Sequence, residues 1–173
     1  MNKVNKKIVP YILPICLILV LSFTRLIPHP ANFTPVLALG IFSGFYFRNF
    51  ILSFFIVISS MFIGDVFLGF HNTMIFTYSS LAVAVLIGLL LKNFNILGIL
   101  IGGTTSSIVF FIVTNFGAWL TLDMYENNLS GLMHSYVLAI PFYHNTLLST
   151  LLYLFLIKVI FELVLNKKVT VNS

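Results

Sequence analysis

Residues 95–115 read NILGILIGGTTSSIVFFIVTN, and no charged side chain occurs between Lys92 and Asp123. The hydrocarbon core of a bilayer is about 30 Å thick, so a helix that crosses it needs about 20 mostly apolar residues. This stretch meets that requirement. It predicts a membrane-spanning helix and therefore an all-α membrane protein.

The composition of the whole chain agrees with this prediction. Of 173 residues, 60% are hydrophobic and 8% are charged, and the mean hydropathy is +1.09. Soluble domains carry about 25% charged residues, so the figures exclude a soluble globular domain as well as a disordered chain. Cys16 is the single cysteine, which excludes an intrachain disulfide.

Five more apolar stretches lie along the chain and predict five more helices. We expect one polytopic membrane domain over residues 1–173, with six transmembrane helices. The polar and aromatic stretch 116–144 is expected to lie outside them. The predicted spans are about 8–27, 34–47, 51–70, 73–91, 95–115 and 145–165.

The basic residues predict the orientation in the membrane. Seven of them fall on one side if every span crosses, and Lys and Arg collect on the cytoplasmic side of membrane proteins. Both termini are then cytoplasmic, in a multi-pass protein of the cytoplasmic (inner) membrane. Topology explains the basic charge, so no nucleic-acid partner is expected. These residues are Lys3, Lys6, Lys7, Arg48, Lys92, Lys167 and Lys168.

The predicted outer side has a different chemistry. All four histidines fall there: three lie in the segments 28–35 and 116–144, and His71 directly follows the third predicted span, near Asp65. Polar variety among aromatic rings is what a small-molecule site needs, so we expect such a site in the outer half. The alternative is an interfacial belt, where Trp and Tyr collect, and it accounts well for Trp119 and Tyr125.

The candidate substrate-binding residues follow from this placement. Flat rings of a ligand would stack between Trp119, Tyr78 and Phe142, and its polar edges would bond Asn32, Asn115 and His71. Arg25 would meet an anionic group or form an ion pair with Asp65. The full set is Arg25, His29, Asn32, Asp65, His71, Tyr78, Asn115, Trp119 and Phe142.

Two further patterns have simpler explanations. Gly40 and Gly44, like Ala84 and Gly88, lie four residues apart, which lets helix backbones approach closely. They serve either packing within the chain or docking to another membrane subunit. Lys158 and Glu162 share one helix face and are expected to pair with each other.

Several enzyme signatures do not occur in the chain. It has no G-x-x-x-x-G-K-[ST] phosphate loop, no H-E-x-x-H motif and no G-x-S-x-G elbow. We therefore expect no enzymatic activity, no catalytic residue, no bound cofactor and no resident metal.

Four segments together resemble a known family: RLIPHPANFTP (25–35), DVFLGFH (65–71), TNFGAW (114–119) and AIPF (139–142). The family consists of small, uncharacterised bacterial integral membrane proteins. At the level of the fold it is similar to the S components of energy-coupling-factor (ECF) vitamin transporters. The resemblance implies an S-component-like bundle of six helices with cytoplasmic termini.

The resemblance also implies a function. S components bind vitamins or their precursors in an outer pocket, capped by the loop after the first helix, which would be residues 28–35 here. They work with a transmembrane coupling subunit and two ATPases. Many dock that subunit through an alanine-x-x-x-alanine pattern in the first helix, which this chain lacks; the nearest equivalent is Gly40 to Gly44.

The leading hypothesis is thus a substrate-binding membrane subunit for uptake of a small micronutrient, a vitamin or its precursor, energised in trans. A second hypothesis is uptake of a metal or metal complex, held by the four histidines and Asp65. A third is a structural membrane protein without a substrate.

Overall fold

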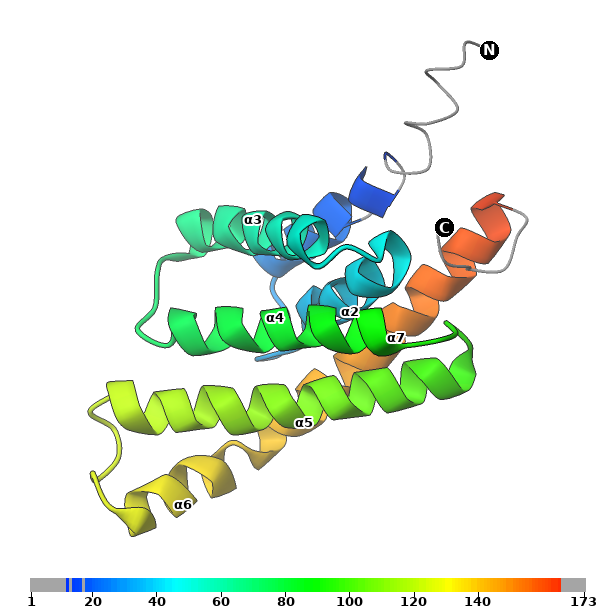
Figure 1. Cartoon of the computed structure of the whole chain (residues 1–173). Helices are drawn as coiled ribbons and strands as arrows, with labels where there is room; N and C mark the ends of the chain where they lie inside the picture. Colours follow the sequence, from blue (N-terminus) through cyan, green and yellow to red (C-terminus); the bar gives the residue numbers. More distant parts are fainter. Residues whose placement is uncertain (1–11, 13, 17, 166–173) are drawn as a thin grey trace.

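The computed structural model of the protein describes residues 12, 14–16 and 18–165, and every element in this part of the chain is a helix (Figure 1). The first apolar helix covers Pro14–Leu26, and its end forms the short 3-10 helix η1. The elements are η1 (Thr24–Leu26), α2 (Val36–Phe47), α3 (Phe50–Leu68), α4 (Met74–Leu90), α5 (Ile96–Thr121), α6 (Leu129–Leu138) and α7 (Ile140–Leu165).

Three of these helices are long and apolar enough to cross a membrane, namely α3, α5 and the part of α7 from Ile140 to Leu163. The helix Pro14–Leu26, α2 and α4 are shorter but also apolar. Large apolar side chains are exposed on the outside of the bundle, as expected for surfaces that face lipid. The protein is an all-α, multi-pass membrane protein.

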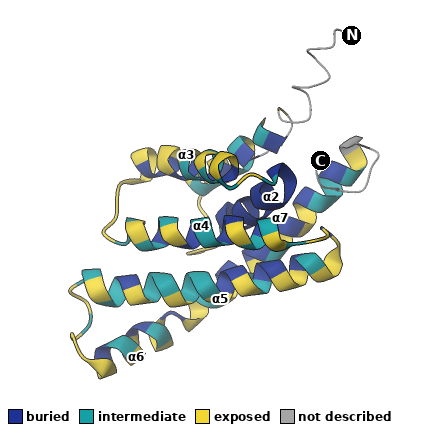
Figure 2. Ribbon diagram, in the orientation of Figure 1, coloured by how far each residue is buried: buried dark blue, intermediate teal, exposed yellow. Residues whose placement is uncertain are grey.

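Helix α2 lies at the centre of the bundle. All of its 12 residues are buried, and it packs against α3, α4, α5 and α7 (Figure 2). At 1.5 Å per residue it is only about 18 Å long, whereas the 26 residues of α5 span about 39 Å. The surrounding helices therefore extend beyond the ends of α2.

The starts of three helices are capped by asparagine. The side chains of Asn49, Asn95 and Asn128 accept hydrogen bonds from backbone N–H groups in the first turns of α3, α5 and α6. Asparagine is among the best N-cap residues because its carbonyl oxygen bonds a donor that has no partner inside the helix. At the end of α2, Arg48 adopts the left-handed conformation with φ 50°, which reverses the chain within one turn.

The spaced small residues pack within the chain. A Cβ on Gly44 would lie 2.1 Å from the carbonyl oxygen of Val85, and one on Gly88 would lie 2.0 Å from that of Ile41. The glycines thus let the backbones of α2 and α4 touch. This confirms the internal-packing interpretation, and Gly40 to Gly44 is wrong as a docking pattern because that face of α2 is covered by α4.

The segment 116–144 differs most from expectation. It was predicted to lie outside the helices, but it contains the end of α5, all of α6 and the start of α7. The reason is that no proline interrupts residues 116–139, and Pro141 falls in the first turn of α7, where proline is tolerated. The other predicted boundaries differ by one or two residues, and the first span lies partly outside the described residues.

The two ends of the bundle carry different segments (Figure 1). The basic turns at Arg48 and Lys92 lie at one end, because α3, α4 and α5 run alternately up and down. The segments 69–73 and 122–128 lie at the opposite end. The structure therefore separates the basic turns from the loops that carry His71 and Asp123.

Candidate functional site

The surrounding helices enclose a cavity of about 420 Å³ at the N-terminal end of α2. Ligand pockets commonly measure about 300–1,000 Å³, so the space suits a small molecule. Every helix from the first to α7 except α6 contributes to its wall, as do the loops before α2 and α4. The lining residues are Arg25, His29, Asn32, Thr34, Val36, Leu37, Met61, Leu68, His71, Thr73, Thr77, Leu81, Phe110, Thr114, Asn115, Ala118, Leu122, Thr146 and Thr150.

The loop between η1 and α2 forms one side of the cavity and is tied to α7. The side-chain amide of Asn145 donates to the carbonyl oxygen of Ala31 at 3.0 Å, and the hydroxyl of Ser149 donates to that of Asn32 at 3.4 Å. Asn32 itself is left-handed, with φ 60°. The loop thereby presents His29 and Asn32 to the cavity.

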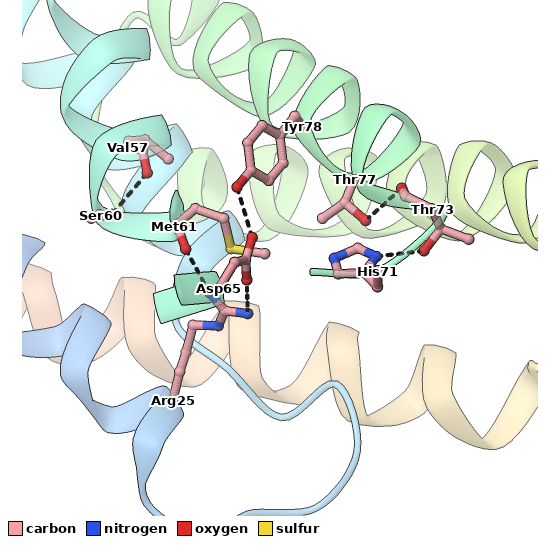
Figure 3. Close-up of polar contacts among 9 residues, drawn as sticks. All are labelled: Arg25, Val57, Ser60, Met61, Asp65, His71, Thr73, Thr77 and Tyr78. Carbon is pink, nitrogen blue, oxygen red and sulfur yellow. Dashed lines mark hydrogen bonds and ion pairs between the residues drawn. The ribbon is translucent and has the colours of Figure 1, made fainter. Parts of the chain in front are cut away.

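A buried ion pair fixes Arg25 in the wall (Figure 3). Its Nη2 lies 2.9 Å from Oδ1 of Asp65, and its Nη1 donates to the carbonyl oxygen of Met61 at 3.2 Å. The hydroxyl of Tyr78 donates to the other carboxylate oxygen at 2.7 Å. The Arg25–Asp65 pair expected as one possibility is thus confirmed, and it joins the first helix to α3 and α4.

His71 lies in the loop between α3 and α4, at the edge of the cavity. Its Nδ1 is 2.8 Å from the hydroxyl oxygen of Thr73, and the backbone carbonyl of Thr73 accepts a bond from Thr77 at 3.2 Å (Figure 3). The imidazole is exposed rather than buried. It is therefore accessible to a molecule that enters the cavity.

Five of the nine predicted binding residues come together in the wall: Arg25, His29, Asn32, His71 and Asn115. They lie on four different segments of the chain, since His29 and Asn32 share the loop between η1 and α2, and they meet only through the fold. Position in the sequence predicted them: each lies near the predicted outer end of a span or in the loop that follows it.

Two of the remaining four residues, Asp65 and Tyr78, support Arg25 without lining the cavity. The indole N–H of Trp119 donates to the backbone carbonyl of Glu126 at 3.0 Å, and its ring lies against Phe116. Phe142 is 44% exposed. The three rings expected to stack on a ligand therefore do not line this cavity.

Sequence reasoning missed most of the threonines in the wall. Thr73 and Thr77 lie four residues apart on the way into α4, and Thr146 and Thr150 lie four apart on α7. Residues at this spacing share a helix face. Two such pairs of hydroxyl groups near outer helix ends could therefore have indicated the wall of a polar cavity. Thr114 on α5 lines the cavity as well and also bonds its own helix.

The histidines do not gather into a metal site. Within residues 12, 14–16 and 18–165, no three His, Cys, Asp or Glu side chains lie close enough together to hold a metal ion. In addition, Asp65, the carboxylate expected to join the histidines, is bonded to Arg25 and Tyr78.

Comparison with known proteins adds a family. The model of a family described as "Family of unknown function (DUF6580)" matches residues 5–172, nearly the whole chain. No curated protein and no solved structure matches the chain.

Proposed function

We propose that this chain, which belongs to the DUF6580 family, is a substrate-binding membrane subunit for uptake of a small micronutrient, a vitamin or its precursor. The observation that carries the proposal is the cavity of about 420 Å³. A polar cavity inside an apolar bundle costs stability, because the removal of polar groups from water must be compensated. A ligand-binding role would explain why the protein retains this cavity.

The arrangement of the wall supports the same role. Its polar side chains come from separate helices and converge on one space, while the apolar side chains of Leu37, Leu81 and Phe110 line the rest. Small-molecule sites combine a mostly apolar wall with a few placed polar groups. A purely structural membrane protein needs no such cavity.

We further propose six crossings of the cytoplasmic membrane with both termini inside. The basic turns at Arg48 and Lys92 share one end of the bundle, which would be the cytoplasmic end. The cavity then opens toward the outside. A reporter fused after Ser173 should be cytoplasmic and one inserted near Asn127 external; the opposite result at either position would contradict this topology.

Energy for uptake would come from another protein. The chain has no phosphate-loop motif, and S components, which the family is similar to, rely on a coupling subunit and ATPases. A coupling subunit would have to dock on a surface other than Gly40 to Gly44, since α4 covers those residues. Purified alone in liposomes, the chain should bind its ligand but not accumulate it with ATP, and ATP-driven accumulation would refute supply in trans.

The direct test is native mass spectrometry of gently purified protein. We expect a small molecule to remain bound to the wild type and to be lost from Thr114→Trp, whose indole would fill the cavity. Ile112→Trp is the matched control, because Ile112 lies on the same helix but is 50% exposed on its outer side. Equal occupancy in both variants would show that the ligand binds elsewhere.

A further inference from the structure

Four of the six threonines in the cavity wall share one hydrogen-bonding pattern. Thr77, Thr114, Thr146 and Thr150 each donate their hydroxyl proton to the backbone carbonyl four residues earlier, at 3.2, 2.7, 2.9 and 2.7 Å. A hydroxyl has one proton and two acceptor lone pairs. With its proton bonded to the helix, each oxygen keeps its lone pairs for another donor. Thr150 is fully buried, so Thr77, Thr114 and Thr146 are the threonines that can offer an acceptor to the cavity.

Asn115 adds a further acceptor to the same wall. Its Nδ2 donates to the carbonyl oxygen of Phe111 at 2.7 Å. Its Oδ1 has no hydrogen-bond partner among the described residues, so this oxygen can accept a bond from a ligand. Helices α4, α5 and α7 thus present hydrogen-bond acceptors to the cavity.

Another part of the cavity wall offers donors. Arg25 lines it with a guanidinium, which has five N–H groups and no acceptor. Val36 and Leu37 begin α2 and also line the cavity, and their N–H groups have no acceptor inside the helix. The N-cap, Pro35, makes no side-chain bond to them. The start of α2 also carries partial positive charge.

The lining contains no carboxylate among the described residues. Asp65, the acid nearest to it, is already bonded to Arg25 and Tyr78. A cationic ligand would therefore be desolvated without a counter-ion and placed beside a guanidinium, which is unfavourable on both counts.

We infer, resting on the proposed function, that the ligand is a small polyhydroxylated molecule without positive charge. Its hydroxyl groups donate to the threonine wall, and one acceptor group, a carboxylate or a carbonyl, faces Arg25 and the first turn of α2. The wall of acceptors and the donors thereby select both the composition and the orientation of the ligand.

Four probes of similar length separate the elements of this inference. Gluconate has hydroxyls and a carboxylate, sorbitol has hydroxyls alone, hexanoate has a carboxylate alone, and glucamine has hydroxyls and a positive charge. Binding to the full-length protein in detergent can be followed by calorimetry. We expect gluconate to bind best, sorbitol next, hexanoate weakly and glucamine least. Tightest binding of glucamine, or hexanoate equal to gluconate, would overturn the inference.

Variants of Thr114 provide the residue-level test. Thr114→Val keeps the shape but removes the acceptor and should weaken gluconate and sorbitol roughly 3- to 10-fold. Thr114→Ser keeps the hydroxyl and should bind both nearly as well as the wild type. Hexanoate should not distinguish the two variants. Equal loss in both variants would indicate a packing role for Thr114 and contradict the inference.

Native mass spectrometry separates a failure of this inference from a failure of the proposed function. A co-purified cation or a hydrocarbon without hydroxyl groups would refute the inference and leave the binding role intact. A co-purified hydroxylated acid or neutral polyol supports both. If no molecule co-purifies and none of the four probes binds, both are refuted.

Discussion

The two ends of α2 lie in opposite environments, although the same helices surround both. Around its C-terminal half the bundle is closed: Phe42 contacts the rings of Phe94 and Phe161, with centroids 5.7 and 4.8 Å away. Around its N-terminal end the bundle is hollow and lined by polar side chains. One short helix thus divides an apolar bundle into a packed half and a hollow half, for which we propose a binding role.

The closed half is stabilised by close packing. Gly44 and Gly88 bring α2 and α4 into backbone contact, and aromatic rings fill the remaining space. Arg48 caps the end of α4 by donating to the carbonyl oxygens of Leu89 and Leu91. Burial lowers the pKa of Arg48 from its ordinary value because desolvation disfavours the charged form.

The hollow half is stabilised by an ion pair and by hydrogen bonds. The buried side chains of the same helix differ between the two halves. In the hollow half α7 carries Thr146 and Thr150, and in the closed half it carries Leu154 and Ile157. The Arg25–Asp65 pair and the bonds from α7 to the loop replace close packing. We therefore expect substitutions in the closed half, or in the Arg25–Asp65 pair, to affect folding, and substitutions of residues that only line the cavity to affect binding.

The largest effect is expected from Gly88→Val. Overpacking costs about 1–3 kcal/mol when side chains can move, but here the new Cβ meets the backbone of Ile41. The helices would have to separate, so we expect no monodisperse protein in size-exclusion chromatography. Gly102→Ala is the control, because its Cβ would first meet the movable end of the Leu91 side chain, 3.1 Å away. A normal elution profile for Gly88→Val would contradict the close approach of α2 and α4.

Asp65→Ala should have the next largest effect. It leaves Arg25, whose side chain is 11% exposed, without its counter-ion, and breaking a buried pair costs about 3–5 kcal/mol. The thermal midpoint in detergent measures the loss. The double variant Arg25→Met, Asp65→Leu should recover most of it, since no unpaired charge remains. A double variant as unstable as the single one would show that the pair is not the cause.

Asn32→Gly and Asn115→Ala should affect binding rather than folding, since glycine tolerates the left-handed backbone of Asn32. Each removes a polar group that lines the cavity, and the loss of one such partner costs about 1–3 kcal/mol, or roughly 5- to 150-fold in affinity. Titration with the molecule identified by mass spectrometry measures this. Trp119→Phe is the control, because Trp119 does not line the cavity. A larger loss in Trp119→Phe than in the two asparagine variants would place the site elsewhere.

The sequence predicted the positions of the helices better than it predicted the cavity between them. Apolar runs bounded by Arg48, Lys92 and asparagine caps located α3, α4 and the start of α5, because their signals are local. The Arg25–Asp65 pair was also predictable, since two opposite charges in apolar helices need each other.

The cavity was only partly predictable because its wall depends on how helices pack. The chain shows that Trp119 and Phe142 lie near the outer ends of helices, but not which way their rings face. Trp119 bonds Glu126 after a turn of the chain that no local pattern specifies. The position of Thr146 and Thr150 in the cavity wall likewise depends on the short length of α2, far away in the sequence.

The smallest effect is expected from the double variant Lys158→Met, Glu162→Gln on α7. The predicted pairing of these residues is confirmed: Nζ of Lys158 lies 2.6 Å from Oε1 of Glu162. A pair four residues apart on a helix contributes only about 0.2–0.5 kcal/mol, and removing both charges leaves neither unpaired. Both residues belong to the closed half and neither lines the cavity, so the thermal midpoint should barely change and the affinity for the ligand should stay at the wild-type value. Tenfold weaker binding in this variant, with Asn115→Ala unaffected, would place the ligand in the closed half and reverse the assignment of the two halves.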